Sequence, residues 1–124
     1  MLTTQHKKRL AKIVKLCTSK NKFTRFKEEI DDIERELTFY HAKACNLIIR
    51  RNKNLKLDLI GFHGQTILHK PKLGYSIQIG DPQLLSKLTK TTVISKFREN
   101  DILHGGQGAP LASIYHKLIL NKIR

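Results

Sequence analysis

The chain has 124 residues, of which 40% are hydrophobic, a size and composition that suit one compact domain. Its formal net charge of +14 indicates an anionic partner, such as nucleic acid, an anionic surface or an anionic small molecule. No apolar stretch reaches the length of a membrane span, and no apolar segment follows the first residues, so we expect neither a membrane protein nor a secretory signal.

Residues 1–24 are predicted to form a basic amphipathic leader helix. Its apolar residues recur at helical spacing: Leu10, Ile13, Val14 and Cys17. The first 27 residues contain nine basic residues and no acidic one, a face that can contact phosphate groups. Because Phe23 is the one aromatic residue before Arg25, stacking on bases has no support, and a solvated helix face is the preferred interpretation. We therefore do not expect nucleic acid as a partner, and a small basic nucleic-acid-binding protein is the last alternative function.

Residues 25–50 give the strongest helical pattern of the chain. The apolar positions that recur every three or four residues are Phe26, Ile30, Ile33, Leu37, Tyr40, Ala44 and Ile48. Thr24 is predicted to cap this helix, and the acidic residues of its early turns suit the helix dipole.

After a turn at residues 52–54, the apolar run 57–62 predicts a mostly buried parallel strand. This strand leads directly into the loop at 63–66. The segments 66–69 and 75–79 flank a turn-forming stretch and predict a hairpin.

The pair Asp81-Pro82 predicts a helix start, because Asp can cap the helix and Pro suits its first position. This helix is expected to end near Thr89, followed by a strand at 91–95, a loop at 97–108 and a last helix from about Pro110. The order of elements predicts an α/β fold in which helices pack on a short mixed sheet.

Cysteine and histidine are informative about compartment and metals. Cys17 and Cys45 both lie on apolar helical stripes and are predicted to be buried free thiols in a reducing cytoplasm. His41 and Cys45 are four residues apart on one helical face, but no second pair has ligand spacing, so we expect no metal site.

Asp101 is the candidate catalytic residue. It is one of three acidic residues after position 60, and it follows a strand and a loop, where α/β sheets gather their ligands. A carboxylate placed there can act as a general base. The alternative is that it caps local backbone amides.

Two further groups are candidate ligand contacts. The glycine-rich loop offers backbone amides to an anion or a sugar through Gly105, Gly106, Gln107 and Gly108. One glycine would suffice for a tight turn, so ligand binding is the preferred interpretation of this loop. His63, Gln65 and Thr66 offer an imidazole, an amide and a hydroxyl that suit sugar hydroxyls, although a single His in a turn is more often structural.

Four motifs in this order resemble the anhydro-N-acetylmuramic acid kinases over about residues 30–124. They are 36–38 with 41–42, 58–66, 78–82, and 97–101 running into 105–111. These sugar kinases belong to the actin-like ATPase superfamily. The resemblance therefore implies that residues 25–124 form a partial sugar-kinase domain with a ribonuclease-H-like fold.

The resemblance also implies a reaction in cell-wall recycling. Family members use ATP and a divalent cation, Mg²⁺, to open the ring of 1,6-anhydro-N-acetylmuramate and form N-acetylmuramate 6-phosphate. The base of the family, the acid of a Phe-Arg-x-x-Asp element, matches Asp101. The loops at 63–66 and 105–108 would line the sugar pocket.

Two departures from the family pattern qualify this expectation. Lys96 stands where the family has an acid, and residues 1–33 contain no glycine-rich phosphate-binding turn. We therefore expect an internal fragment that lacks the first strands and the second domain, binds neither ATP nor Mg²⁺, and is inactive alone. The alternative is one piece of a split kinase that a complementing chain restores.

Overall fold

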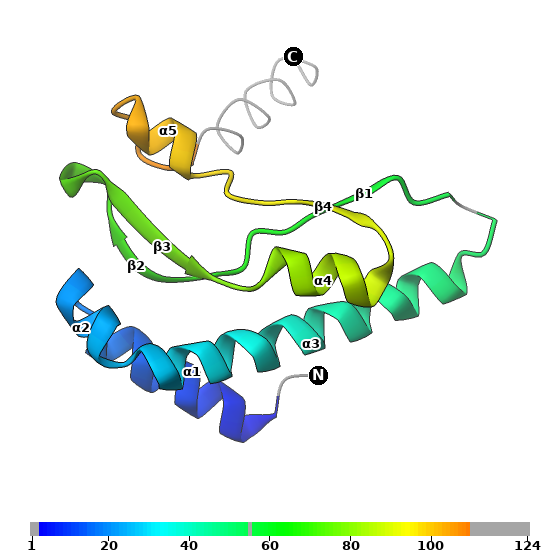
Figure 1. Ribbon diagram of the computed structural model, residues 1–124, viewed down its shortest axis with the longest axis horizontal. Coiled ribbons are helices and arrows are strands. Elements are labelled where there is room, and N and C mark those ends of the chain that lie inside the picture. Colours follow the sequence, from blue (N-terminus) through cyan, green and yellow to red (C-terminus); the bar gives the residue numbers. More distant parts are fainter. Residues whose placement is uncertain (1–2, 55, 110–124) are drawn as a thin grey trace, which may run out of the picture. The chain divides into compact units, whose positions relative to one another are not determined.

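The computed structural model describes residues 3–54 and 56–109, which contain both helices and strands and confirm the predicted α/β class. Figure 1 traces these elements along the chain. The chain divides into two compact units: one comprises Met1–Leu68 with Gln78–Ser95, and the other comprises His69–Ile77 with Lys96–Arg124. No helix of the described part combines the length and the apolar character that a membrane span requires.

The chain begins with two capped helices in the first unit. Helix α1 spans Thr4–Leu16, within the expected leader segment 1–24, and the Thr3 side chain caps it by accepting the backbone N–H of His6 at 3.1 Å. The expected leader helix is interrupted at residues 17–19, which are not helical. Ser19 instead caps helix α2, Lys20–Arg25, because its hydroxyl accepts the N–H of Lys22. The predicted boundary between residues 24 and 25 stays a prediction.

The long helix α3 spans Lys27–Arg51, close to the predicted 25–50. Thr24 does not cap it: this residue belongs to α2, where its hydroxyl donates to the Lys20 carbonyl at 3.2 Å. The first residue outside the helix is Phe26, which makes no side-chain cap. Two acidic residues of the first turn, Glu28 and Glu29, favour the helix dipole there, as expected.

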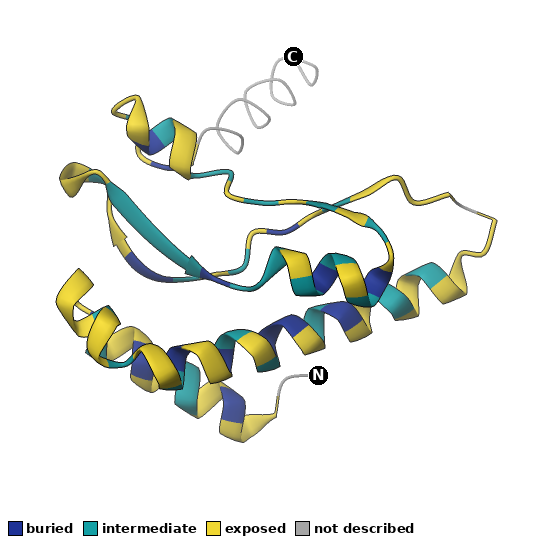
Figure 2. Ribbon diagram, viewed as in Figure 1, coloured by how far each residue is buried: buried dark blue, intermediate teal, exposed yellow. Residues whose placement is uncertain are grey.

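The apolar stripe of α3 is confirmed in its first half and wrong in its second. Ile30, Ile33 and Leu37 are buried, while Ile48 is 62% exposed. Ala44 is also exposed, and Ala42 is buried in its place. The physical reason is that α3 packs against α1 along its first half and against helix α4 (Pro82–Thr89) further on, so the buried face changes along its length (Figures 1 and 2).

Strands β1 (Leu59–Gly61) and β4 (Thr92–Ile94) pair in parallel, as the apolar run predicted. The expectation of a mostly buried strand is wrong. Ile60 and Val93, opposite each other in the register, pack against a core of Ala42, Phe62 and Leu85. Leu59 and Ile94 belong to the other face of the pair, because side chains alternate along a strand, and they are 50% and 43% exposed.

The predicted hairpin and the helix that follows it are confirmed. Strands β2 (Gln65–Lys70) and β3 (Tyr75–Ile79) pair with each other, so the described strands form two two-stranded sheets. The short helix η1 (Pro71–Leu73) and Gly74, with φ of 75°, make the turn. Asp81 then caps α4 by accepting the N–H of Leu84 at 2.9 Å.

The second unit contains a helix where a loop was predicted. Helix α5 spans Glu99–Leu103 within the expected 97–108 loop. The sequence does not indicate this helix, because α5 has five residues and one buried side chain, Ile102, and a single apolar position cannot show a helical period. The last predicted helix lies outside the described residues.

Candidate functional site

Asp101 lies on α5, and the glycine-rich loop folds back onto it. The Gly108 N–H donates to the Asp101 Oδ2 at 2.6 Å, and the Gly106 N–H donates to the Asp101 backbone carbonyl at 2.8 Å. The carboxylate therefore caps a local amide, which is the alternative interpretation of this residue. A capping bond does not exclude catalysis, because a carboxylate has two oxygens.

The remaining carboxylate oxygen, Oδ1, accepts no hydrogen bond from the described part of the chain. Across residues 3–54 and 56–109, the Gly108 N–H is the one hydrogen-bond donor to the Asp101 side chain. A side chain held through Oδ2 keeps Oδ1 to accept a proton from a positioned nucleophile. Asp101 is half-buried, so part of this residue is in contact with solvent.

The glycines of this loop are needed for close approach. A Cβ at Gly106 would collide with the Asp101 carboxylate, and its φ is not in the left-handed region, so sterics alone demand glycine there. Gly108 is buried, has φ of +77°, and a Cβ on it would lie 2.9 Å from the Ile102 Cδ1. These positions therefore require glycine to bring the loop against α5.

Arg98 holds the same loop from the carbonyl side. Its Nη1 donates to the Gly108 carbonyl at 2.8 Å. Gly108 is thus fixed at both backbone groups, the N–H by Asp101 and the carbonyl by Arg98. The Arg98 Nε is buried and has no hydrogen-bond partner among the described residues.

In the first unit, the motifs at 63–66 and 78–82 meet. Gly64, with φ of +64°, approaches the Ile79 carbonyl so closely that a Cβ would overlap it. Beside it, the Gln78 side-chain amide donates to the Thr66 hydroxyl at 3.2 Å. Segments separated by more than ten residues are therefore held together by both backbone packing and a side-chain bond.

Helix α3 fixes the second of these motifs. Glu34 accepts the backbone N–H of Gly80 at 2.8 Å through its Oε1, and the buried Thr38 accepts the N–H of Asp81 at 3.0 Å. Glu34 and Thr38 are four residues apart and so share one helix face. His41, one turn further on, bonds the Leu37 carbonyl and packs edge-on against the Phe62 ring.

The predicted site residues fall into two groups. His63 and Gln65 are exposed and Thr66 is half-buried in the first unit, while Asp101 and the glycine loop belong to the second. Within the glycine loop, Gly105 and Gln107 are exposed.

Sequence reasoning assigned no role to the residues that hold these loops, Arg98, Glu34 and Thr38. The four-residue spacing of Glu34 and Thr38 was a usable signal for a shared helix face, whereas their distant backbone partners were not visible.

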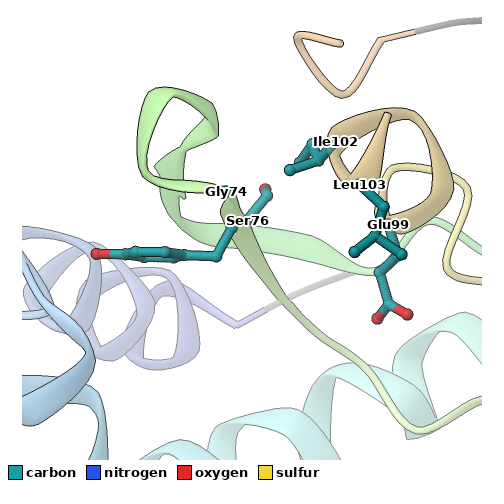
Figure 3. A pocket seen from close by; sticks show the side chains of 6 residues that line it. Gly74, Ser76, Glu99, Ile102 and Leu103 are labelled. Carbon is teal, nitrogen blue, oxygen red and sulfur yellow. The ribbon is translucent and has the colours of Figure 1, made fainter. Parts of the chain in front are cut away.

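The second unit also has a shallow hollow of about 230 Å³ between the hairpin turn and α5 (Figure 3). Its lining residues are Gly74, Tyr75, Ser76, Glu99, Ile102 and Leu103. Among the residues that the structure describes, no three His, Cys, Asp or Glu side chains gather as metal ligands.

The two cysteines differ in environment. Cys17 is buried, as predicted, and this burial raises the pKa of its thiol, with a smaller contribution from the nearby Glu29 carboxylate. Cys45 is half-buried rather than buried, because the inward face of α3 turns toward Ala42 in this region. Both are free thiols.

Known proteins identify the family of this chain. A profile described as anhydro-N-acetylmuramic acid kinase matches residues 6–124, which begins earlier than the expected residue 30. A protein of this name from Pelagibacter ubique is 51% identical over 94 residues, which cover 76% of this chain and 25% of the relative. Namesakes from Rhizobium etli and Gluconobacter oxydans are each 44% identical, over 77% and 76% of this chain and 26% of each relative. The chain thus spans about a quarter of the length of these curated relatives, and it belongs to the anhydro-N-acetylmuramic acid kinase family.

Proposed function

We propose that this chain supplies the sugar-side part of a kinase that opens and phosphorylates 1,6-anhydro-N-acetylmuramate, with Asp101 as the base. The names of the relatives support the activity, and the fold of Gly105–Gly108 around one Asp101 oxygen supports the role of that residue. The ribonuclease-H-like fold of the superfamily is part of this proposal. Two free cysteines favour a reducing cytoplasm as its location.

The chemistry that Asp101 would perform is proton removal. Water is a weak nucleophile until a positioned carboxylate takes its proton as the new oxygen–carbon bond forms. In the proposed reaction the water oxygen bonds to the anomeric carbon, the bond from that carbon to O6 breaks, and O6 is released for phosphorylation. Within the second unit, the amides of the glycine loop at 105–108 would contact the sugar beside Asp101. His63, Gln65 and Thr66 of the first unit stay candidate sugar contacts in their own right.

The described residues do not fit ATP and Mg²⁺. The first glycine in the sequence is Gly61, so no glycine-rich phosphate turn precedes it, and the described part has no cluster of metal ligands. We propose that another polypeptide segment, or a complementing chain, holds the phosphoryl donor, and that the 124 residues alone do not turn over the sugar.

A chimera tests this proposal. The matching segment of the Pelagibacter ubique relative is replaced by this chain's residues, and ATP-dependent phosphorylation of the anhydro-sugar is measured. Asp101→Asn in the chimera is expected to lower kcat about 10²- to 10⁴-fold, the usual contribution of a general base. Asp31→Asn, an exposed carboxylate paired with Lys27, is the matched control and is expected to leave kcat unchanged. Equal rates for the two variants would refute the role of Asp101.

A further inference from the structure

We infer that Arg98 is a positioning residue that orients the Asp101 carboxylate through Gly108. This inference rests on the proposed function, because it assigns Arg98 a role in presenting the base. Arg98 and Asp101 are three residues apart, and both contact the same glycine, one through each backbone group.

The geometry makes the two contacts depend on each other. The N–H and the carbonyl of Gly108 belong to successive planar peptide units that are joined through its φ and ψ, so holding both groups restricts these two rotations. The φ of +77° at Gly108 has to be maintained for its N–H to reach the Asp101 Oδ2 at 2.6 Å. The Arg98 bond at 2.8 Å therefore selects the loop conformation in which the Gly108 N–H occupies Oδ2 and leaves Oδ1 to accept a proton.

The guanidinium is built into the fold. Its Nε is buried without a partner among the described residues, although an unmet buried donor is unfavourable. The burial of this Nε shows that the guanidinium is held against the protein, and its bond to the Gly108 carbonyl fixes its direction. Lysine cannot reproduce this arrangement fully, because it has neither a planar fork nor a second nitrogen to fix its direction.

The first test is a double-mutant cycle in the chimera. Arg98→Met is expected to lower kcat at least 10-fold with KM changed less than 3-fold, since misplacing the base slows chemistry more than it weakens sugar binding. In the Asp101→Asn background the same change is expected to lower kcat less than 2-fold, because its effect passes through the carboxylate. Arg98→Lys is expected to recover part of the loss. An equal loss in both backgrounds would overturn the inference and assign Arg98 a purely structural role.

The second test uses the 124-residue chain and needs no turnover. The Gly108 amide proton, in a short bond to a carboxylate, is expected far downfield in the NMR spectrum and to move upfield in both Arg98→Met and Asp101→Asn. Lys96→Met is the control, because this lysine is 70% exposed and pairs with Glu99 rather than with the loop. An unmoved Gly108 signal in Arg98→Met would refute the positioning role of Arg98. If the signal moves but Asp101→Asn has no effect on turnover of the chimera, the proposed function is refuted, while the contact of Arg98 and Asp101 through Gly108 stands.

Discussion

Replacing Gly106 by alanine tests whether close approach to Asp101 is what this loop requires. The new methyl group would overlap the carboxylate, so either the loop or the side chain has to move. Overpacking of this kind costs about 1–3 kcal/mol. This cost corresponds to roughly a 5- to 150-fold loss in the population of the conformation in which the loop contacts Asp101. Because Gly106 lacks a left-handed φ, this cost is steric and owes nothing to backbone strain.

The neighbouring Gly105 provides the matched control. It has φ of +81°, but a Cβ there would meet no atom within 4 Å, so alanine at this position introduces backbone strain without a collision. The assay is the Gly108 amide shift of the 124-residue chain together with turnover of the chimera. Gly106→Ala is expected to abolish the downfield shift and lower kcat more than Gly105→Ala does. The steric reasoning fails if the two variants are indistinguishable in both measurements.

Three further outcomes are expected. Gly64→Ala should lower the free energy of unfolding in urea by about 2–4 kcal/mol, because Gly64 combines a left-handed φ with a backbone collision. Gly74→Ala should lower it by only about 1–2 kcal/mol, because Gly74 has a left-handed φ but no neighbour within 4 Å. Equal losses of stability in the two variants would contradict this reasoning. Cys17 should react with a thiol reagent at pH 8 more slowly than Cys45, because its raised pKa lowers its thiolate fraction and burial blocks access; Cys17→Ser identifies the slow phase, and a faster Cys17 would refute the assignment. Leu59 and Ile94 form an exposed apolar face on the β1–β4 pair that we expect to self-associate, so Leu59→Lys should lower the particle size in light scattering. An unchanged particle size would contradict this expectation.

The elements that sequence reasoning placed correctly are those with local signals. The hairpin and α4 follow from turn chemistry at Gly74 and from a capping Asp followed by Pro, and each signal acts within a few residues. The errors arose where contacts between distant elements determine which residues are buried. Ala42 rather than Ala44 is buried because α4 packs on that part of α3, and α4 is far away in the sequence.

The same distinction applies to the candidate site. Asp101 and the glycine loop lie within seven residues, so their association could be expected from the sequence. The bond from Gly80 to Glu34 spans 46 residues and could not be expected from the sequence. Arg98 stood inside a recognised motif, yet its role depends on the path of the loop that follows, which no period or spacing reveals.

The hydrogen bonds that Glu34 and Thr38 of α3 accept from the Gly80 and Asp81 amides limit how this helix can change in length. One inserted residue would rotate everything beyond it by about 100° around the helix axis. Placed between Thr38 and Ala42, such an insertion would separate the face that holds the amides from the face that packs on α4. Natural or engineered insertions should therefore be tolerated after Arg51, where the helix has ended, and rejected within its central turns.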